Sequence, residues 1–444
     1  MKDLTKGMPA KVILLFALPL ILGNILQQVY NLADAKIVSE YAGEISFAAI
    51  GATMVIVNLM TGFVNGLTQG FGILIARCFG AKDEMRMRKF IAGTVKLTLI
   101  VTVLMTVIGE LVIHNLLVLL KTPDTILYEA ELYIRILIGG FVCSCVYNML
   151  ANILRAVGDS KRPLYCLMGA IVINIGLDLL FIPVLHLGIK GAAIATVISQ
   201  GIAALSVAMI VWKKYRMIIP RRKEWNLDTD QYLNLSVSGL SMGFMNCIVS
   251  FGTIILQSGI NGLGTNIIQA HTAGRKVFDV LMVMIFTVGI AMTTYVSQNL
   301  GAGKIDRVRQ GVRQAMIVET VLTTLMILIC YTLGGKMVCW LASSSEKEVI
   351  EPGVMYIRVG VLFFYVLGPL FVLRCSLQGL GRKIVPVVSS ILELLVKIVS
   401  VLFLVPRLQY FGVALTEPIS WIVMTIWLAV AYIRLDIDNI VKGE

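Results

Sequence analysis

Long apolar runs separated by short polar segments repeat along the whole chain. Because the hydrocarbon core of a bilayer is about 30 Å thick, one membrane-spanning helix needs roughly 20 consecutive apolar residues. This length predicts twelve spans, of which two, 46–76 and 266–297, exceed one crossing and are expected to tilt or protrude. The twelve expected spans are approximately 12–38, 46–76, 90–113, 128–154, 164–185, 188–212, 233–258, 266–297, 314–335, 353–374, 384–405 and 409–433. The pattern predicts an all-α polytopic membrane protein.

The composition excludes the main soluble classes. Of the 444 residues, 58% are hydrophobic and 14% are charged, whereas about 25% of the residues of an ordinary soluble domain are charged. The mean hydropathy of +0.87 is too high for a surface that must face water. Soluble enzymes, nucleic-acid-binding proteins and disordered chains are therefore excluded.

Lysine and arginine gather on one side of the expected spans. With both chain termini placed in the cytoplasm, 26 of the 38 Lys and Arg residues fall in cytoplasmic segments and five fall outside. Cytoplasmic loops of membrane proteins carry such an excess. The distribution predicts that both termini are cytoplasmic, and it accounts for the net charge of +12 without a nucleic-acid partner.

Glycine-containing landmarks recur at a nearly constant offset. Gly158 and Pro163 match Gly381 and Pro386 at an offset of 223. The other matching pairs are segment 80–82 with segment 301–304, and Gly188 with Gly412. Since an even number of spans separates the members of each pair, the two halves have the same orientation, as in a parallel repeat about the membrane normal.

The longest hydrophilic stretch lies between the sixth and seventh expected spans. It predicts an N-terminal six-helix lobe over residues 1–212, a cytoplasmic inter-lobe loop over residues 213–230 and a C-terminal six-helix lobe over residues 231–444. Two repeated lobes with a path between them are typical of transporters.

Six segments carry loop motifs in a constant order: Val29–Val38, Arg77–Lys82, Asn152–Pro163, Gly188–Thr196, Gln298–Ala302 and Ser376–Gly381. Together they resemble the multidrug and toxic compound extrusion (MATE) family, and in particular its bacterial branch with the DinF-type members. The resemblance covers essentially the whole chain. It implies a transporter of the bacterial cytoplasmic (inner) membrane that works by alternating access. It also implies export of organic, often cationic, compounds, driven by inward flow of protons or sodium ions.

Carboxylates inside the apolar spans are the first candidates for chemistry, because a charge at mid-bilayer costs several kcal/mol unless it is paired or hydrated. Asp34 lies in the first span, and Asp178 lies in the fifth with Asn174 four residues earlier, on the same helix face. Their oxygen atoms suit a sodium ion, and desolvated carboxylates can also take a proton. The resemblance places the amino-terminal cation site of the family on these same three positions. The alternative is structural, with Asp34 capping a helix end and Asp178 bonded to backbone.

The second lobe differs from the family members that carry sodium-binding acids in spans seven and ten. Residues 233–259 and 359–373 contain no acid, so a carboxylate site of that kind is not expected. Glu393 and Lys397 instead form an i, i+4 pair, which is either a self-neutralising structural pair or a cavity group that selects substrate charge. In the eighth span, Asp279 is spaced to pair with Arg275 or Lys276, and His271 lies one turn before them.

Other polar and flexible side chains of the first two spans are expected to line a substrate cavity. These candidates are Gln27, Tyr30, Asn31, Met54 and Asn58. With His271, Arg275, Lys276, Asp279, Glu393 and Lys397 they complete the expected substrate contacts.

Sequence motifs distinguish the expected transporter from the remaining function classes. No phosphate-binding loop of an ATP-driven pump occurs, and no motif of a hydrolase, so an enzyme is not expected. The expected protein is a monomeric antiporter without a cofactor, whose partners are a small-molecule substrate and membrane lipid. The alternative is a flippase of lipid-linked saccharides or related lipids on the same scaffold, which a large basic cavity would favour.

Overall fold

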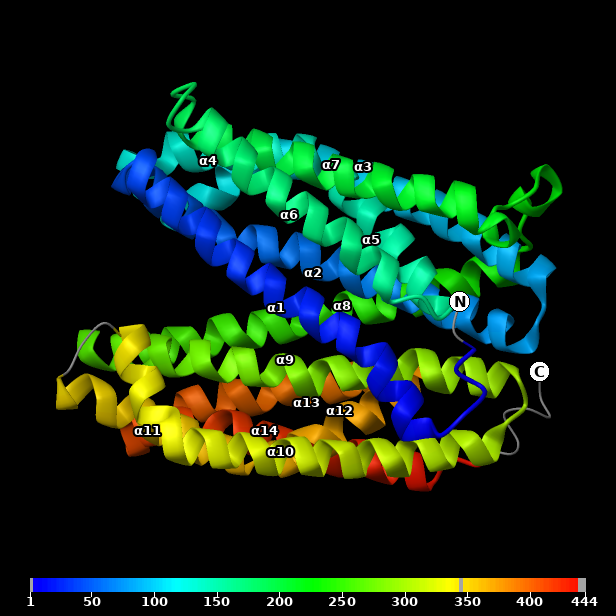
Figure 1. Cartoon of the computed structure of the whole chain (residues 1–444). Coiled ribbons are helices and arrows are strands. Elements are labelled where there is room, and N and C mark those ends of the chain that lie inside the picture. Colours follow the sequence, from blue (N-terminus) through cyan, green and yellow to red (C-terminus); the bar gives the residue numbers. More distant parts are fainter. Residues whose placement is uncertain (1–2, 343–345, 438–444) are drawn as a thin grey trace. The chain divides into compact units, whose positions relative to one another are not determined.

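A computed structural model describes residues 3–342 and 346–437, and these residues form helices and connecting turns without a strand. Both chain termini, which are expected in the cytoplasm, lie outside the described residues. The long helices follow the chain as labelled in Figure 1. Their bounds are α1 (Pro9–Tyr41), α2 (Glu44–Ala81), α3 (Glu84–Leu119), α4 (Asp124–Gly139), α5 (Phe141–Ala156), α6 (Lys161–Phe181), α7 (Gly188–Lys214), α8 (Thr229–Asn261), α9 (Thr265–Gly301), α10 (Ile305–Ala342), α11 (Lys347–Leu362), α12 (Phe364–Gly379), α13 (Ile384–Val399) and α14 (Val405–Ile433).

The predicted all-helical membrane fold is confirmed. Nine helices of the described residues are long and apolar enough to cross a membrane. Two bent pairs add one span each: α4 and α5 meet at 48°, and α11 and α12 meet at 52°. The stretch 384–433 counts as one of the nine but is 50 residues long, more than twice the roughly 20 residues of one crossing. Its backbone leaves the helical region at Gln409 (φ 51°, ψ −135°), the residue at which the second of the two spans expected there begins.

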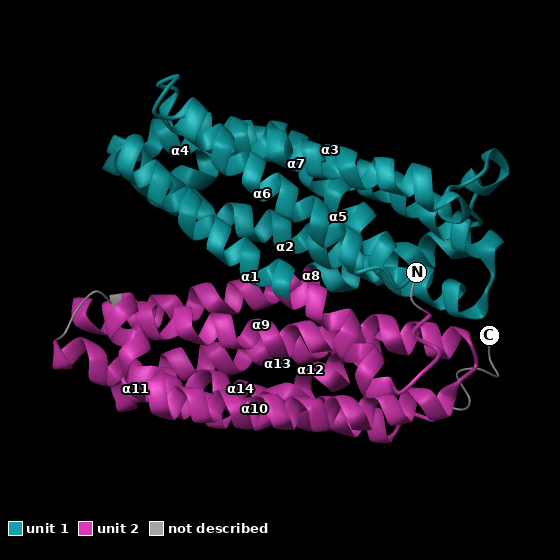
Figure 2. Ribbon diagram, viewed as in Figure 1, with its two compact units in different colours: residues 1–2, 22–243 teal, residues 3–21, 244–444 magenta. Residues whose placement is uncertain are grey.

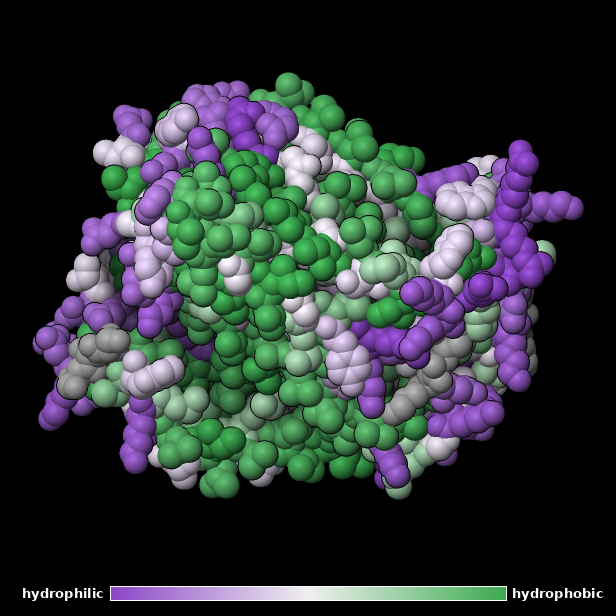
Figure 3. Space-filling model, turned by 45° about the horizontal axis from the view of Figure 1, so that its top comes forward, coloured by the Kyte–Doolittle hydropathy of each residue, from purple (hydrophilic) through white to green (hydrophobic). Residues whose placement is uncertain are grey.

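The outer surface of the helices has the polarity that lipid requires. Large apolar side chains such as Leu111, Val172 and Val321 are more than 60% exposed. Figure 3 shows apolar side chains over much of the visible face, with hydrophilic side chains gathered toward its edges. Because water would make this exposure costly, the surface fits a hydrocarbon environment.

The sequence repeat is also a repeat of backbone conformation. Left-handed residues stand at equivalent turns of both halves, where the chain reverses between consecutive helices. The matched pairs are Gly43 (φ 91°) and Gly264 (φ 97°), Lys82 (φ 57°) and Gly303 (φ 68°), and Gly158 (φ 83°) and Gly381 (φ 81°). L-residues rarely adopt this conformation, so its recurrence shows that the two halves turn in the same way.

The chain packs into two compact units, which Figure 2 shows in different colours. Unit 1 contains residues 22–243, and unit 2 contains residues 3–21 and residues 244–437 of the described chain. Helix α1 therefore begins in unit 2 and continues in unit 1, whereas α8 begins in unit 1 and continues in unit 2. The change of unit falls after residue 21 in α1 and after residue 243 in α8, so the two changes are separated by about the same offset as the sequence repeat. The lobe limits at residues 212 and 231 remain a prediction, because the units are defined by packing whereas the lobes are defined by the sequence repeat.

Unit 1 contains an unusually close helix contact between α2 and α8. A Cβ atom on Gly70 would lie 2.3 Å from the carbonyl oxygen of Ser238, and the Ser238 hydroxyl donates a hydrogen bond of 2.8 Å to the Gly70 carbonyl oxygen. Small residues allow such backbone approach in membranes. The contact attaches the first part of α8 to unit 1.

The segment between α7 and α8 also packs on unit 1, through the short helices η1 (Arg216–Ile218) and η2 (Arg222–Trp225). The Glu224 carboxylate accepts hydrogen bonds from Arg88 Nε (2.8 Å) and from the Arg221 backbone N–H (2.7 Å). Burial alone would raise the pKa of Glu224, but these two donors outweigh it and hold the pKa below its ordinary value. The ionised carboxylate thus stabilises the attachment of this segment.

The N-terminal segment packs on unit 2 in a corresponding way. Leu4 is buried together with the first turns of α1, and its backbone N–H donates to the Gln298 side chain (3.1 Å). Asn299 and Lys304 donate to the carbonyl oxygens of Leu4 and Thr5 at 3.3 and 2.9 Å. The motif residues Gln298 and Asn299 thereby hold the start of the chain.

Candidate functional site

The acids of the first repeat meet inside unit 1. Asp34 comes from the part of α1 that belongs to this unit, and Asp178 comes from α6. Their carboxyl groups lie close enough to act on each other electrostatically. Asp178 is 0% exposed and Asn174, one turn earlier on α6, is 2% exposed. The structure therefore brings together the three residues that the sequence singled out.

The polar atoms of this group lack the partners that buried groups normally have. Both carboxylate oxygens of Asp178, Oδ1 of Asp34 and both amide atoms of Asn174 accept or donate no hydrogen bond within the described chain. A hydrogen bond between two carboxyl groups requires a proton on one of them, because ionised carboxylates only accept. Buried polar groups without partners are costly. A proton or a small cation would supply what these oxygens lack.

Hydroxyl groups surround the acid pair. Tyr30 of α1 and Tyr133 of α4 lie close enough to interact electrostatically with both Asp34 and Asp178. The Tyr30 side chain also lies close to the Thr196 side chain of α7. Tyr133 and Thr196 were not predicted from the sequence, because hydroxyl-bearing residues are common in apolar spans and nothing in their spacing marks them.

The other cavity candidates of unit 1 lie on its first two helices. Gln27 donates a weak hydrogen bond of 3.4 Å to Asn31 one turn later on α1. Met54 and Asn58, also one turn apart, are exposed on α2. Tyr30 is the member of this set that reaches the acid pair. Their contact with substrate remains a prediction.

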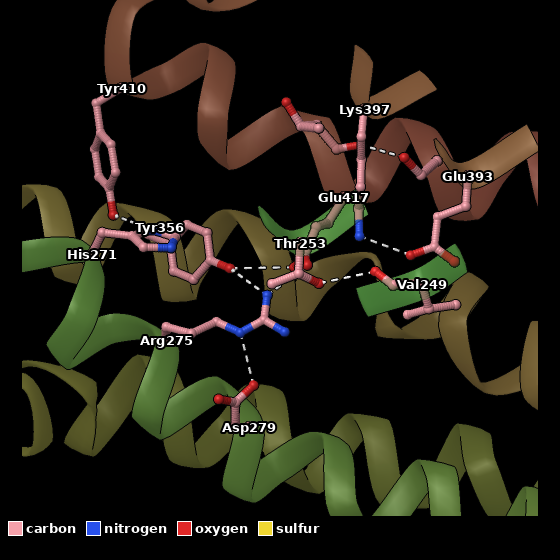
Figure 4. A network of polar contacts seen from close by, with 12 residues as sticks. Val249, Thr253, His271, Arg275, Asp279, Tyr356, Glu393, Lys397, Tyr410 and Glu417 are labelled. Carbon is pink, nitrogen blue, oxygen red and sulfur yellow. Dashed lines mark hydrogen bonds and ion pairs between the residues drawn. The ribbon is translucent and has the colours of Figure 1, made fainter. Parts of the chain in front are cut away.

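Unit 2 contains a charged network with the centre at Arg275, shown in Figure 4. Arg275 donates to Asp279 Oδ1 (2.7 Å), one turn later on α9, and to Glu417 Oε1 (2.5 Å) on α14. Tyr356 of α11 donates to the other oxygen of Glu417 at 3.2 Å. The expected pairing of Asp279 with Arg275 is therefore present, and Glu417 joins it from a distant part of the sequence.

The expected pair of Glu393 and Lys397 extends this network. Lys397 Nζ donates to Glu393 Oε1 at 2.8 Å along α13, and both side chains are buried. Lys397 also acts electrostatically on Glu417, and Glu393 acts in the same way on Arg374 of α12. The charges alternate in sign through the series Arg374, Glu393, Lys397, Glu417, Arg275 and Asp279, which we call the charge chain of unit 2.

A pocket of about 180 Å³ opens beside this network, between α8 and α9 of unit 2. His271, Arg275 and Lys276 line it together with apolar and amide side chains of α8. His271 is otherwise held by the Tyr410 hydroxyl at 3.3 Å, as Figure 4 shows. Ligand pockets for drug-sized molecules have about 300–1,000 Å³. This pocket alone holds only part of such a molecule.

Glu417 was not among the predicted site residues, although the sequence contains a signal for it. It is an acid inside an apolar run, which is the same feature that singled out Asp34.

Among the described residues, no three His, Cys, Asp or Glu side chains gather as a metal site. The acid pair with Asn174 contains two carboxyl groups and an amide.

The sequence model of the MatE family matches residues 19–180 and, a second time, residues 242–402. The chain belongs to the MatE family. The double match coincides with the two repeats described above. The family includes multidrug efflux transporters, and relatives of the chain are named as transporters or as multidrug resistance or export proteins and not as enzymes.

The chain covers most of the length of relatives that are named as multidrug resistance or transport proteins. The "probable multidrug resistance protein YoeA" of Bacillus subtilis is 28% identical over 92% of this chain and 90% of its own length. The "FAD transporter" of Shewanella oneidensis is 23% identical over 86% and 85%. Among solved structures, an "outward-facing conformation of a multidrug resistance MATE family transporter" superposes with a TM-score of 0.90 at 21% identity, covering 99% of this chain and 98% of that one.

Proposed function

We propose that this MatE-family chain is a secondary active antiporter that exports organic compounds in exchange for protons or sodium ions. The observation that carries the proposal is the group of Asp34, Asp178 and Asn174, in which Asp178 and Asn174 are buried, Asp34 is half-buried, and the enclosed polar atoms are short of partners. An ion that completes such a site changes its charge and its packing together. The pair is thus suited to couple ion binding to a rearrangement of α1.

The proposed cycle follows from linkage. The coupling ion binds Asp34, Asn174 and Asp178 while the cavity is open to the outside, and neutralises the carboxyl charge. The unit 1 part of α1 then repacks, substrate affinity falls, and the protein reopens toward the cytoplasm, where the ion leaves. Ion and substrate must prefer opposite states, because a ligand shifts an equilibrium only by its differential affinity.

Organic cations and amphipathic drug-like molecules are the proposed substrates, in keeping with the multidrug relatives. The specific observation that favours a second candidate is the basic lining of the unit 2 pocket, with Arg275 and Lys276. Such a lining suits anionic headgroups, as a flippase of lipid-linked saccharides or related lipids would need. Binding assays with cationic dyes and with lipid-linked precursors separate the two candidates.

Vesicles with separately imposed pH and sodium gradients test the coupling. Efflux of a cationic dye is expected to follow one of these gradients in the wild type and to be lost in the Asp178→Asn protein, because the amide cannot be ionised. Asp124→Asn, on an acid that lies at the start of α4 outside the acid pair, is the control. Wild-type efflux by Asp178→Asn would show that the coupling site lies elsewhere.

The setting of the protein is proposed from charge and family. The excess of Lys and Arg in alternate loops supports an orientation with both termini inside. The bacterial relatives support the cytoplasmic membrane of a bacterium, where the proposed form is a monomer surrounded by lipid. Single cysteines introduced at exposed loop positions, tested with a membrane-impermeant thiol reagent on intact cells, are expected to react at 121 and to stay unreactive at 223. The opposite labelling would reverse the orientation.

A further inference from the structure

One buried acid of unit 2 is used neither by the charge chain nor by the pocket. Glu319, in the apolar part of α10, is 0% exposed, and neither of its carboxylate oxygens has a hydrogen-bond partner in the part of the chain that the structure describes. Thr323, one turn later on the same helix, is also 0% exposed, and its hydroxyl lacks a partner in the same range of residues. Three oxygen atoms are therefore buried together and unsatisfied.

A glycine of the neighbouring helix makes the space for this carboxyl group. A Cβ atom on Gly368 of α12 would lie 2.9 Å from Glu319 Cβ and 3.4 Å from Glu319 Oε2. Contacts below 3.0 Å force a shift of one of the two helices, so a larger residue at 368 does not fit beside the acid. The close packing of α10 and α12 thus encloses Glu319.

The repeat shows that this pair of residues is specific to unit 2. Helices α3 and α10 start 221 residues apart, and α5 and α12 start 223 residues apart. By these offsets Glu319 corresponds to Thr98, and Gly368 corresponds to Cys145. Unit 1 therefore has a short neutral residue and a thiol at the positions where unit 2 has a long acid packed against a glycine. The larger residue on α10 and the smaller one on α12 of unit 2 fit each other in size, which supports a specific site for the acid.

Charged and titratable groups on the packed helices do not satisfy the carboxyl group. Cys375 of α12 lies within electrostatic reach of Glu319. Tyr295 of α9 packs on α10 two turns away and donates its hydroxyl to the Arg307 carbonyl oxygen. On the α11 side, Arg358 lies over the ring of Tyr331, three turns away. The Tyr365 hydroxyl at the start of α12 is bonded to Thr324.

We propose that Glu319 is a second proton-binding site, located in unit 2 and separate from the acid pair of unit 1. Proton uptake forms one O–H bond at a carboxylate oxygen and removes the buried negative charge, and release returns the proton to water. Three oxygens are too few for a hard cation, which takes roughly six. The uncharged acid fits the closed contact of α10 and α12, and ionisation requires that contact to open. A role in coupling rests on the proposed antiport, whereas proton binding itself does not.

Infrared difference spectroscopy of the purified full-length protein in lipid tests the site directly. A protonated carboxyl group has a C=O stretching band that disappears on ionisation. Between about pH 5 and pH 9, where buried acids titrate, the wild type and Asp178→Asn are expected to share one such titrating band. Glu319→Gln is expected to lack it, with the loss of one titrating proton per molecule.

A second variant tests the assignment of the band to Glu319 even if Glu319→Gln fails to fold. Glu319→Thr combined with Gly368→Cys reproduces the residues of unit 1, so it is expected to fold and to lack the same band. If no band in this pH range is lost with Glu319 in either variant, the proposal is overturned. If the band titrates but no pH gradient drives efflux, the proton site stands and proton antiport fails, so the two proposals are tested separately.

Discussion

Replacing Lys397 by Met removes a cation that lies between two carboxylates of the charge chain. Lys397 Nζ is 2.8 Å from Glu393 Oε1, and the two side chains are 3% and 9% exposed. Breaking a buried ion pair from one side costs about 3–5 kcal/mol, because the partner is left as an uncompensated charge. We expect Lys397→Met to be at the upper end of this range, since Lys397 also compensates Glu417.

The single change Glu393→Gln is expected to cost a similar amount, because Lys397 keeps Glu417 as a neighbour but Arg374 loses the carboxylate that acts on it. The double variant restores a balanced charge. Its loss in free energy of unfolding should therefore be smaller than the sum of the losses of the two single variants, by on the order of 0.5–3 kcal/mol. Denaturant titration in mixed micelles, followed by tryptophan fluorescence, measures the three free energies of unfolding. Glu40→Gln, on an exposed acid at the end of α1, is the control and is expected to change little.

The substrate range of the double variant decides between the two roles of the pair. A folded double variant with an unchanged range supports a structural pair, and a changed preference for substrate charge assigns selection to Lys397. Strictly additive losses would refute the reasoning from compensation. Failure of the double variant to fold would refute both roles, because neither requires more of the pair than its charges.

Three further changes test the packing and the electrostatics described above. Gly70→Ala should force α2 away from α8 and cost about 1–3 kcal/mol. Gly169→Ala should be neutral in thermal unfolding, because an added Cβ there would meet no atom of another part of the chain within 4 Å. The lowered pKa of Glu224 contributes stability that is complete above its unfolded pKa, near 4.3, and is lost as the pH falls through the folded pKa. The stability difference between wild type and Glu224→Gln should therefore shrink on acidification below about pH 4.5, and a pH-independent difference would contradict the assignment. Leu4→Ala, at a residue 1% exposed, should lower the free energy of unfolding by about 2–5 kcal/mol, and Met8→Ala, at 65% exposure, should not.

The helical fold could be predicted because the bilayer imposes a length on each apolar run. The breaks inside two spans could not be predicted in this way. A Cβ atom at Gly140, where α4 meets α5, would lie 2.4 Å from the Val197 side chain of α7. The reason for a small residue at this bend is thus a tertiary contact, which no local pattern reveals.

The candidate site, like the fold, could be predicted from the sequence only in part. Asp34 and Asp178 stood out because acids are rare in apolar runs, and the pairing of Arg275 with Asp279 follows from helical spacing. The contact of Arg275 with Glu417 joins residues 142 positions apart. Such a pairing depends on how helices pack, so the sequence gives no offset by which to expect it.

Helices α1 and α8 each belong partly to unit 1 and partly to unit 2. The residues that they pack against are therefore synthesised at different times relative to the helices themselves. The part of α8 that unit 1 needs follows directly after the rest of that unit, whereas the buried residues Leu4, Ile13 and Phe16 pack against residues some 290 positions later in the chain. At about 5–20 residues per second, the ribosome needs roughly 15–60 s to make the missing partners. For that time the first half of α1 stays in the membrane without the surface that buries it, and unit 2 closes around it only near the end of translation.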